Sequence, residues 1–285
     1  MAKIPTAGKI REGSQAVRVI WIGVLVLLMV LCLFPFVYMI LMSLIDAKML
    51  RVSIAALMES RYSFDNYIKL FMENQYGHYV LNSVVVSACG VFLSCLFGAM
   101  GGYAFAKKKF PGRDGLFLGL LALSMIPTTV LLIPRFLVAR KLGLMNTWAG
   151  LYLPTVAGAG IFLTHQFLKG LPDTLLEAAD IDGCGEFRKF VQIVCPLIKP
   201  VLTTLAITTF TVLWGDMLWP LVMVTDNDKT TLTLAVTTLK KRTEGETKYG
   251  EVFAGYVLTM MPTLLVYICG QKYFIEGISV SGLKL

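Results

Sequence analysis

Six stretches of this sequence are long enough and apolar enough to cross a lipid bilayer. Five of them contain no Asp, Glu, Lys or Arg: residues 19–45, 79–106, 115–134, 142–168 and 252–271. The sixth, 200–225, contains a single charged residue, Asp216. Because a helix needs about 20 mostly apolar residues to cross the hydrocarbon core, each run can form a span. The sequence therefore predicts an all-α integral membrane protein with six transmembrane helices.

The composition agrees with a membrane protein and argues against a soluble one. Hydrophobic residues make up 56% of the chain, charged residues only 15%, and the mean hydropathy is +0.71. In a soluble domain the formal charge of +8 would suggest binding to nucleic acid. Here Lys and Arg gather at the ends of apolar runs, where they would meet lipid headgroups. We therefore expect the membrane, and not nucleic acid, to be the partner of these charges.

Two basic clusters indicate how the chain is oriented. The first lies in the tail 1–18, ahead of the first apolar run, and the second fills the short connection after the run 79–106, with Lys107, Lys108, Lys109 and Arg113. Basic residues of this kind favour the cytoplasmic side. The first run lacks a small-residue cleavage site, so we expect it to be retained as a span. With six spans, both termini and the polar loop 171–199 would then be cytoplasmic.

The loop 171–199 is a sustained polar break between two long apolar runs, and its pattern predicts two short helices. Thr174 and Glu177 have the spacing of a capping box at the start of the first helix, and Asp182-Gly183 forms a turn signal at its end. In the second helix, Phe187, Phe190, Val191 and Val194 recur at helical spacing, with Arg188, Lys189 and Gln192 expected to face away, before Pro196 ends it. An amphipathic connector lying on the membrane surface would show the same pattern.

A stripe of small residues runs along the second apolar stretch. Gly90, Ser94, Gly98 and Gly102 recur at four-residue intervals. Such a stripe lets another helix approach closely, which predicts a packed bundle.

No motif for enzymatic chemistry is present in the sequence. It contains no Walker loop, no HExxH or GxSxG motif and no cluster of Cys and His with metal-ligand spacing. We therefore expect a chain that is not an enzyme, holds no metal or cofactor of its own and carries its six cysteines as free thiols.

Asp216 is the one acid within an apolar run, where a charged group is costly and is often functional. Trp214 and Trp219 lie on either side of it, and Pro220 follows. A carboxylate with tryptophans suits sugar recognition in a translocation path. Aromatic residues and a helix cap at the membrane interface would explain the same residues.

The loop also carries a pattern that resembles a known family. Glu177-Ala178-Ala179 is followed after three residues by Gly183, after nine more by Ile193, and then by Cys195 and Pro196. This resembles the cytoplasmic signature of the permease subunits of binding-protein-dependent ABC importers, with Cys195 where that family usually has Leu. Flanking stretches, among them DNYIKLF, YAFAKKKFPGR and LWPLVMV, resemble the carbohydrate-uptake branch, of the maltose and glycerol phosphate type.

The resemblance implies a function, a set of partners and a location. The chain would lie in a bacterial plasma (inner) membrane and move a sugar or oligosaccharide together with a second, homologous permease. Two ATPase subunits would bind ATP and Mg²⁺, and an extracytoplasmic solute-binding protein would deliver the sugar. The coupling helix between spans four and five would contact an ATPase through Glu177, Ala178, Ala179, Asp182, Gly183 and Pro196. Asp216 and Trp219 are the candidates for the translocation path.

Two other functions are compatible with a polytopic membrane chain. An ATP-independent secondary transporter or channel is the first, although Asp216 is the only acid well inside a span that an ion relay could use. A membrane-bound enzyme or assembly scaffold is the second. The sequence leaves open which sugar is carried and whether Glu177 bonds a partner or caps its own helix.

Overall fold

The computed structural model describes residues 15–45, 61–72, 75–156, 158–242 and 249–282. Within these ranges the secondary structure is helical, without β-strands, and Ile45 and Tyr62 form an isolated antiparallel bridge. The predicted N-terminal tail lies mostly outside the described residues. The all-α class is confirmed.

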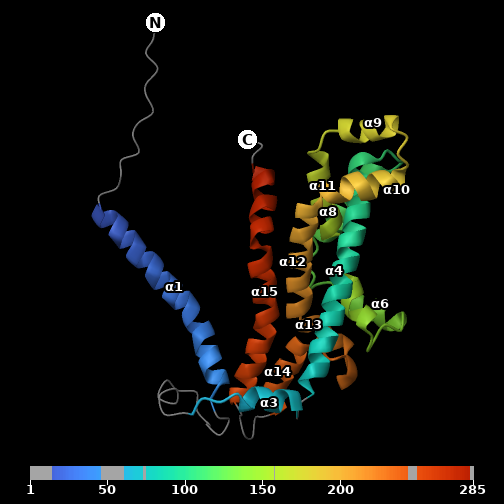
Figure 1. Ribbon diagram of the computed structural model, residues 1–285. Coiled ribbons are helices and arrows are strands. Elements are labelled where there is room, and N and C mark those ends of the chain that lie inside the picture. Colours follow the sequence, from blue (N-terminus) through green and yellow to red (C-terminus); the bar gives the residue numbers. More distant parts are fainter. Residues whose placement is uncertain (1–14, 46–60, 73–74, 157, 243–248, 283–285) are drawn as a thin grey trace.

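Three helices are long and apolar enough to cross a membrane (Figure 1). They are α1 (Gln15–Ser43), α4 (Tyr76–Lys107) and α15 (Tyr249–Gly282). A fourth candidate is α12 (Lys199–Gly215), if it is counted as one span with the helical stretch Glu186–Leu197, from which it is bent by 74°. These helices coincide with the apolar runs expected at 19–45, 79–106, 200–225 and 252–271.

The other apolar runs are divided into shorter helices. The run 115–134 holds α5 (Arg113–Ser124) and the start of α6 (Leu132–Lys141), and the run 142–168 holds α7 (Trp148–Tyr152), the 3₁₀ turn η1 (Leu153–Thr155) and α8 (Ala159–Lys169). With 12 residues, α5 is about 18 Å long, which is less than the roughly 30 Å of a hydrocarbon core. The helices in these two runs are therefore interrupted. Six spans remain a prediction, and a span formed by either of these two runs would be a broken one.

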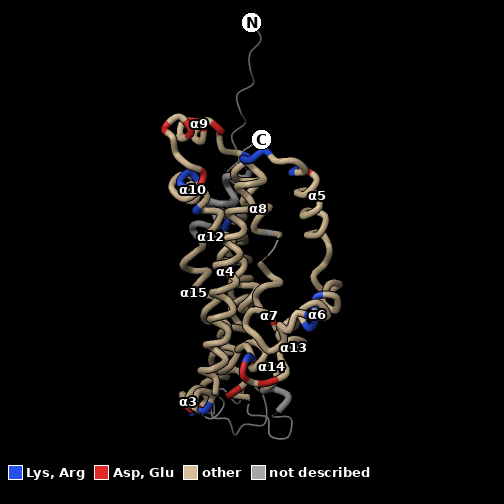
Figure 2. Tube along the Cα trace, turned by 90° about the vertical axis from the view of Figure 1, so that its right-hand side faces the viewer, with Lys and Arg blue, Asp and Glu red and all other residues tan. Residues whose placement is uncertain are grey.

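The remaining helices lie at the two ends of the bundle. Those at the end shown at the bottom of Figure 1 are α3 (Asp65–Met72), α13 (Leu218–Met223) and α14 (Leu232–Arg242), and the 3₁₀ turn η3 (Asn227–Lys229) precedes α14. Those at the opposite end are α9 (Thr174–Ile181), α10 (Glu186–Lys189) and α11 (Cys195–Leu197). The start of α1 and the end of α15 lie at the same end as α9. Figure 2 shows that charged residues also gather towards the two ends, with a largely uncharged band between them.

The small-residue stripe on α4 is a packing surface, as predicted. A Cβ on Gly98 would lie 3.1 Å from the carbonyl carbon of Gly160 on α8, and one on Gly102 would lie 2.5 Å from Cβ of Thr164. All four residues of the stripe are buried. Larger side chains at Gly98 or Gly102 would therefore push α4 and α8 apart, because atoms of α8 already occupy the space that a side chain would need.

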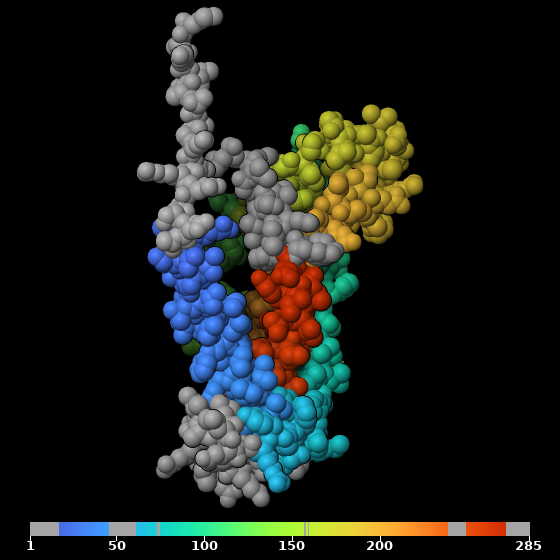
Figure 3. Space-filling model, turned by 60° about the vertical axis from the view of Figure 1, so that its left-hand side comes forward, coloured from blue at the N-terminus to red at the C-terminus, as the bar shows by residue number. Residues whose placement is uncertain are grey.

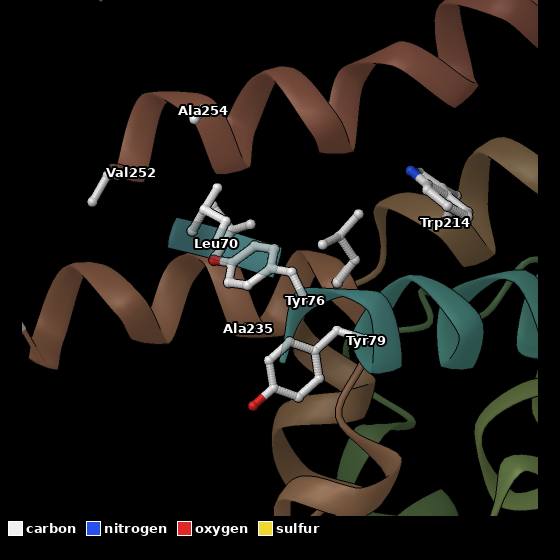
Figure 4. Packing of buried hydrophobic residues seen from close by; sticks show 9 residues of the cluster. Leu70, Tyr76, Tyr79, Trp214, Ala235, Val252 and Ala254 are labelled. Carbon is white, nitrogen blue, oxygen red and sulfur yellow. The ribbon is translucent and has the colours of Figure 1, made fainter. Parts of the chain in front are cut away.

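An aromatic cluster joins five helices at the end opposite α9 (Figure 4). It contains Leu70 from α3, Tyr76 and Tyr79 from α4, Trp214 from α12, Leu232, Ala235 and Val236 from α14, and Val252 and Ala254 from α15. The indole N–H of Trp214 also donates to the carbonyl of Thr259, at 2.8 Å. This cluster fixes the ends of α4, α12 and α15 relative to one another.

Candidate functional site: the loop between α8 and α12

The first helix of the loop ends in a Schellman motif. The backbone N–H of Gly183 donates to the carbonyl of Asp180 at 3.1 Å, and that of Cys184 donates to the carbonyl of Ala179 at 2.9 Å. Gly183 has φ of +72°. This pair of bonds needs a left-handed residue after the helix, which glycine adopts without steric cost. The turn predicted at Asp182-Gly183 is confirmed.

The start of α9 differs from the prediction. The helix begins at Thr174 itself, Asp173 is the residue before it, and no side-chain hydrogen bond caps the helix. Glu177 is exposed and makes no side-chain hydrogen bond to any other part of the described chain. The expected capping box was therefore wrong. Glu177 does not cap its own helix, so its carboxylate is free to bond a partner.

The second helix of the loop also differs from the prediction. It runs through α10, a π-helical turn over Phe190–Val194 (η2) and α11, so Pro196 lies within helix and the bend comes after it, at Ile198. The bend is next to Pro200 in the first turn of α12, and Pro200 lacks the N–H that would continue the helix across Ile198. Pro196 as the end of the second helix was a wrong expectation.

Lys189 was expected to face solvent, yet its side chain is only 3% exposed. Its Nζ lies 2.5 Å from Oδ1 of Asp180 on α9 and 2.5 Å from Oε1 of Glu186 on its own helix. The hydrogen bond to Asp180, and then the one to Glu186, raise the pKa of Lys189 above its ordinary value. Helical periodicity did not reveal that Lys189 is buried, because its two acidic partners lie on different helices, Asp180 on α9 and Glu186 on α10.

Lys107 and Lys108, two of the lysines predicted to be cytoplasmic, hold the loop against α4. Lys107 Nζ donates to the carbonyl of Leu171 at 2.6 Å and to Oδ1 of Asp173 at 2.5 Å. Lys108 pairs with Oε2 of Glu186, which also accepts a hydrogen bond from Tyr103 Oη at 3.3 Å. Hydrogen bonds from Lys108 and Lys189 lower the pKa of Glu186 from 4.5 to about 2. The loop is therefore attached to the end of α4 both just before α9 and at α10.

Two large apolar side chains are the most exposed ones of the loop. Ile181, the last residue of α9, is 87% exposed, and Phe187 on α10 is 80% exposed. Figure 3 shows the loop, in yellow and orange, projecting beyond the rest of the molecule. An apolar surface outside the membrane-length helices is typical of a protein interface. The sequence pattern assigned Phe187 to the packed face and did not single out Ile181.

The other predicted coupling residues lie around this surface. Ala178, Asp182, Gly183 and Pro196 are exposed, whereas Ala179 is 5% exposed and packs inward. A methyl group on Gly183 would meet no atom within 4 Å in this chain. Their assignment to an ATPase contact stays a prediction, and the loop presents all of them except Ala179 to solvent.

Asp216 lies where the apolar run 200–225 is interrupted, between α12 and α13. Its backbone is extended, and its Oδ1 accepts a hydrogen bond from the backbone N–H of Trp219 at 3.2 Å. Trp219 is 6% exposed and donates its indole N–H to the carbonyl of Gly150 at 2.9 Å. Asp216 therefore caps α13, while Trp219 packs between helices of this chain. Of the two residues predicted for the path, only Asp216 keeps part of its surface open.

Among the described residues, no three His, Cys, Asp or Glu side chains lie close enough together to hold a metal ion.

The molecule is thus an apolar helical bundle with a charged, ion-paired loop at one end, which is the architecture of an integral membrane protein. Comparison with known families gives the class directly. Residues 90–280 match the family described as "Binding-protein-dependent transport system inner membrane component", and the chain belongs to that family. The membership predicted from the loop motif is confirmed.

Relatives of known name are permease proteins. The arabinooligosaccharides transport system permease protein AraQ of Halalkalibacterium halodurans is 40% identical over 79% of this chain and 81% of its own length. The sn-glycerol-3-phosphate transport system permease protein UgpE of Pectobacterium atrosepticum is 34% identical over 71% of this chain and 73% of its own. These names agree with the carbohydrate-uptake branch that the motifs indicated.

A solved structure shares the fold. It is the crystal structure of a bacterial ABC transporter involved in the import of the acidic polysaccharide alginate, which aligns with a TM-score of 0.80. The alignment covers 94% of this chain and all of the other at 21% identity.

Proposed function

We propose that this chain is a membrane-spanning subunit of an ATP-driven importer that moves a sugar or oligosaccharide. A second, homologous permease would complete the translocation path, two ATPase subunits would bind ATP and Mg²⁺, and an extracytoplasmic solute-binding protein would deliver the sugar. The chain would cross the plasma membrane six times with both termini in the cytoplasm. The family and the transport names of the relatives support this proposal.

The observation that carries the proposal is the exposed surface of the loop. Ile181 and Phe187 are largely exposed and lie in a segment held to α4 by ion pairs, at the same end as the start of α1 and the end of α15. A rigid, apolar projection is suited to a pocket on another protein, because little conformational entropy is lost on docking. We infer that α9 is the coupling helix and that these two side chains enter the ATPase with it.

We propose that the surface for sugar lies between α12 and α15. An open groove of about 320 Å³ is lined there by Ile207, Thr208, Thr211, Val212, Tyr267, Gly270 and Gln271. Threonine, tyrosine and glutamine side chains can hydrogen-bond sugar hydroxyls, and they are costly when they face lipid tails. The hydroxyl groups of Thr208 and Thr211 donate hydrogen bonds to backbone carbonyls within α12. Their oxygen lone pairs are left to accept hydrogen bonds from a ligand. We infer that this groove, with Asp216 beyond it, faces the path.

The test is reconstitution of the permease pair with its ATPase and binding protein in liposomes. Uptake of a labelled oligosaccharide should require internal ATP and should persist when ion gradients are dissipated. Ile181→Asp and Phe187→Asp should reduce ATPase association and uptake, whereas Thr174→Ala, on an exposed position of α9, should not. Uptake that follows an ion gradient without ATP would instead identify a secondary transporter. Normal ATPase association in both Asp variants would show that α9 is not the contact.

A further inference from the structure

The covalent connections of α9 to the membrane helices are bent at both ends. On one side the chain turns through Gly170 to Pro172 before α9, and on the other it passes the 74° bend at Ile198 before α12. Bends of this kind are the positions at which a helix pivots. A push on α9 through these connections alone would tend to fold the loop and leave the bundle unmoved.

Ion pairs bypass both bends. Lys189 joins Asp180 on α9 to Glu186 on α10, and Glu186 is joined in turn to Lys108 at the end of α4. Separately, Lys107 joins the residues just before α9 to the same end of α4. The two ends of α9 are thus each linked to α4 by charged groups.

Lys189 is the centre of this arrangement because its side chain is almost fully buried. Its side chain is 3% exposed, while the acids on either side are about 60% exposed. Removing one acid leaves a buried cation with fewer partners, which is costly. The angle between α9 and α10 is therefore held by a group that has few alternative partners.

The helix that receives these links is central to the bundle. Along its length α4 packs against α8 and α12, and its small-residue stripe leaves no gap between the α4 and α8 backbones. A displacement of the end of α4 must therefore carry α8 and α12 with it.

We propose that Asp180, Glu186, Lys189 and Lys108 are positioning residues for transport, which make α4 follow α9 so that movement of the loop reaches α4, α8 and α12 together. This proposal rests on the proposed function, in which the ATPase moves α9. It adds that the force enters the bundle through α4 as well as through the chain leading into α12.

The experiment compares transport with ATP hydrolysis in the reconstituted complex. Glu186→Gln, Lys108→Met and Lys189→Met should retain ATPase association and ATP hydrolysis but move less sugar per ATP. We expect a fall of roughly 2- to 30-fold, the range typical of residues that couple two sites. The double variant Lys108→Met with Glu186→Gln should lose no more than the stronger single variant, because both changes remove the same bond.

The neighbouring Lys109 provides a matched control. It is exposed and forms no ion pair within the described part of the chain, so Lys109→Met should keep the wild-type amount of sugar per ATP. Lys189→Arg, which keeps the cation, should recover most of what Lys189→Met loses. Thermal unfolding of each purified variant separates loss of coupling from loss of fold.

Two results would overturn the proposal. One is a wild-type ratio of sugar to ATP in Glu186→Gln and Lys108→Met, and the other is losses that add in the double variant. Either could occur while Ile181→Asp still abolishes ATPase association, in which case α9 remains the contact and only the role of α4 is wrong. If Ile181→Asp and Phe187→Asp also behave as wild type, the proposed function fails as well.

Discussion

The indole N–H of Trp148 donates a hydrogen bond of 2.9 Å to Oδ1 of Asn82, so two helices meet through a fully buried amide. The amide nitrogen of Asn82 in turn donates to the carbonyls of Asp228 and Thr230, at 2.9 and 3.0 Å. One side chain on α4 therefore holds both the start of α7 and the segment that leads into α14. Each of its polar atoms has a partner, which is the condition for burying an amide without penalty.

Asn82→Leu should destabilise the protein strongly. The substitution leaves the Trp148 indole and the Thr230 carbonyl without these partners, whereas the Asp228 carbonyl keeps its contact with Nε2 of His78. Each unsatisfied buried group costs about 1–3 kcal/mol. A lower thermal unfolding midpoint of the purified protein would report the loss. Thr225→Val removes one exposed hydrogen bond to Asn146 and should shift the midpoint little. Equal midpoints for Asn82→Leu and the wild type would contradict the assignment.

Gly183→Ala should weaken ATPase association and sugar uptake, although nothing in this chain would touch the added methyl group. The cost arises from φ of +72°, a conformation that penalises a non-glycine residue by roughly 1–2 kcal/mol. Gly185 has φ of −65° and equal space, so Gly185→Ala is the matched control and should have no effect. If both alanine variants behave alike, the Schellman turn is not what the ATPase recognises.

Comparing Asp216→Asn with Asp216→Ala should separate the effect of the helix cap on stability from the effect of the charge on sugar uptake. Asparagine keeps an oxygen that accepts from the Trp219 N–H, so the unfolding midpoint should be retained, whereas alanine should cost about 0.5–2 kcal/mol. We expect Asp216→Asn to lower the rate of sugar uptake because it removes the charge beside the path. Unchanged uptake in a stable Asp216→Asn protein would leave Asp216 as a helix cap only.

Glu186 should make stability depend on acid pH. Its pKa is about 2 in the folded protein, against an ordinary 4.5, because Lys108 and Lys189 hydrogen-bond the carboxylate. A lowered folded pKa contributes stability that is complete above the unfolded pKa and is lost as the pH falls through the folded one. The difference in unfolding midpoint between the wild type and Glu186→Gln should therefore be constant above about pH 5 and shrink as the pH is lowered towards 2. Lys108, Lys189 and Tyr103 contact the carboxylate, and Asp180 pairs with Lys189. A difference that stayed constant down to pH 3 would show that the two lysines do not hold Glu186 ionised.

Much of the site could be read from local patterns. The Asp182-Gly183 turn was predictable because a left-handed glycine after a helix is specified by its immediate neighbours. The stripe from Gly90 to Gly102 was predictable because four-residue spacing puts small residues on one face of any helix. Both features depend on one segment at a time.

The errors share a different cause. Phe187 was assigned to a packed face and Lys189 to solvent, on the rule that apolar residues point inward. That rule presumes a core beneath the helix, but the loop projects past the bundle and α10 meets charged groups of α9 and α4 instead. Similarly, the apolar runs did not reveal where helices break, as α12 does at Asp216, because hydropathy does not report whether the backbone stays helical.

The membrane class, the family and the place of the loop along the chain can be predicted from the sequence, because they depend on the length of apolar runs and on an ordered motif. The contacts of Glu186 with Tyr103 and of Lys107 with Asp173 could not be predicted, because these pairs are separated by 83 and 66 residues and meet only in the folded bundle. Charges attract at short range, and which of many lysines and acids come within that range depends on how the helices pack.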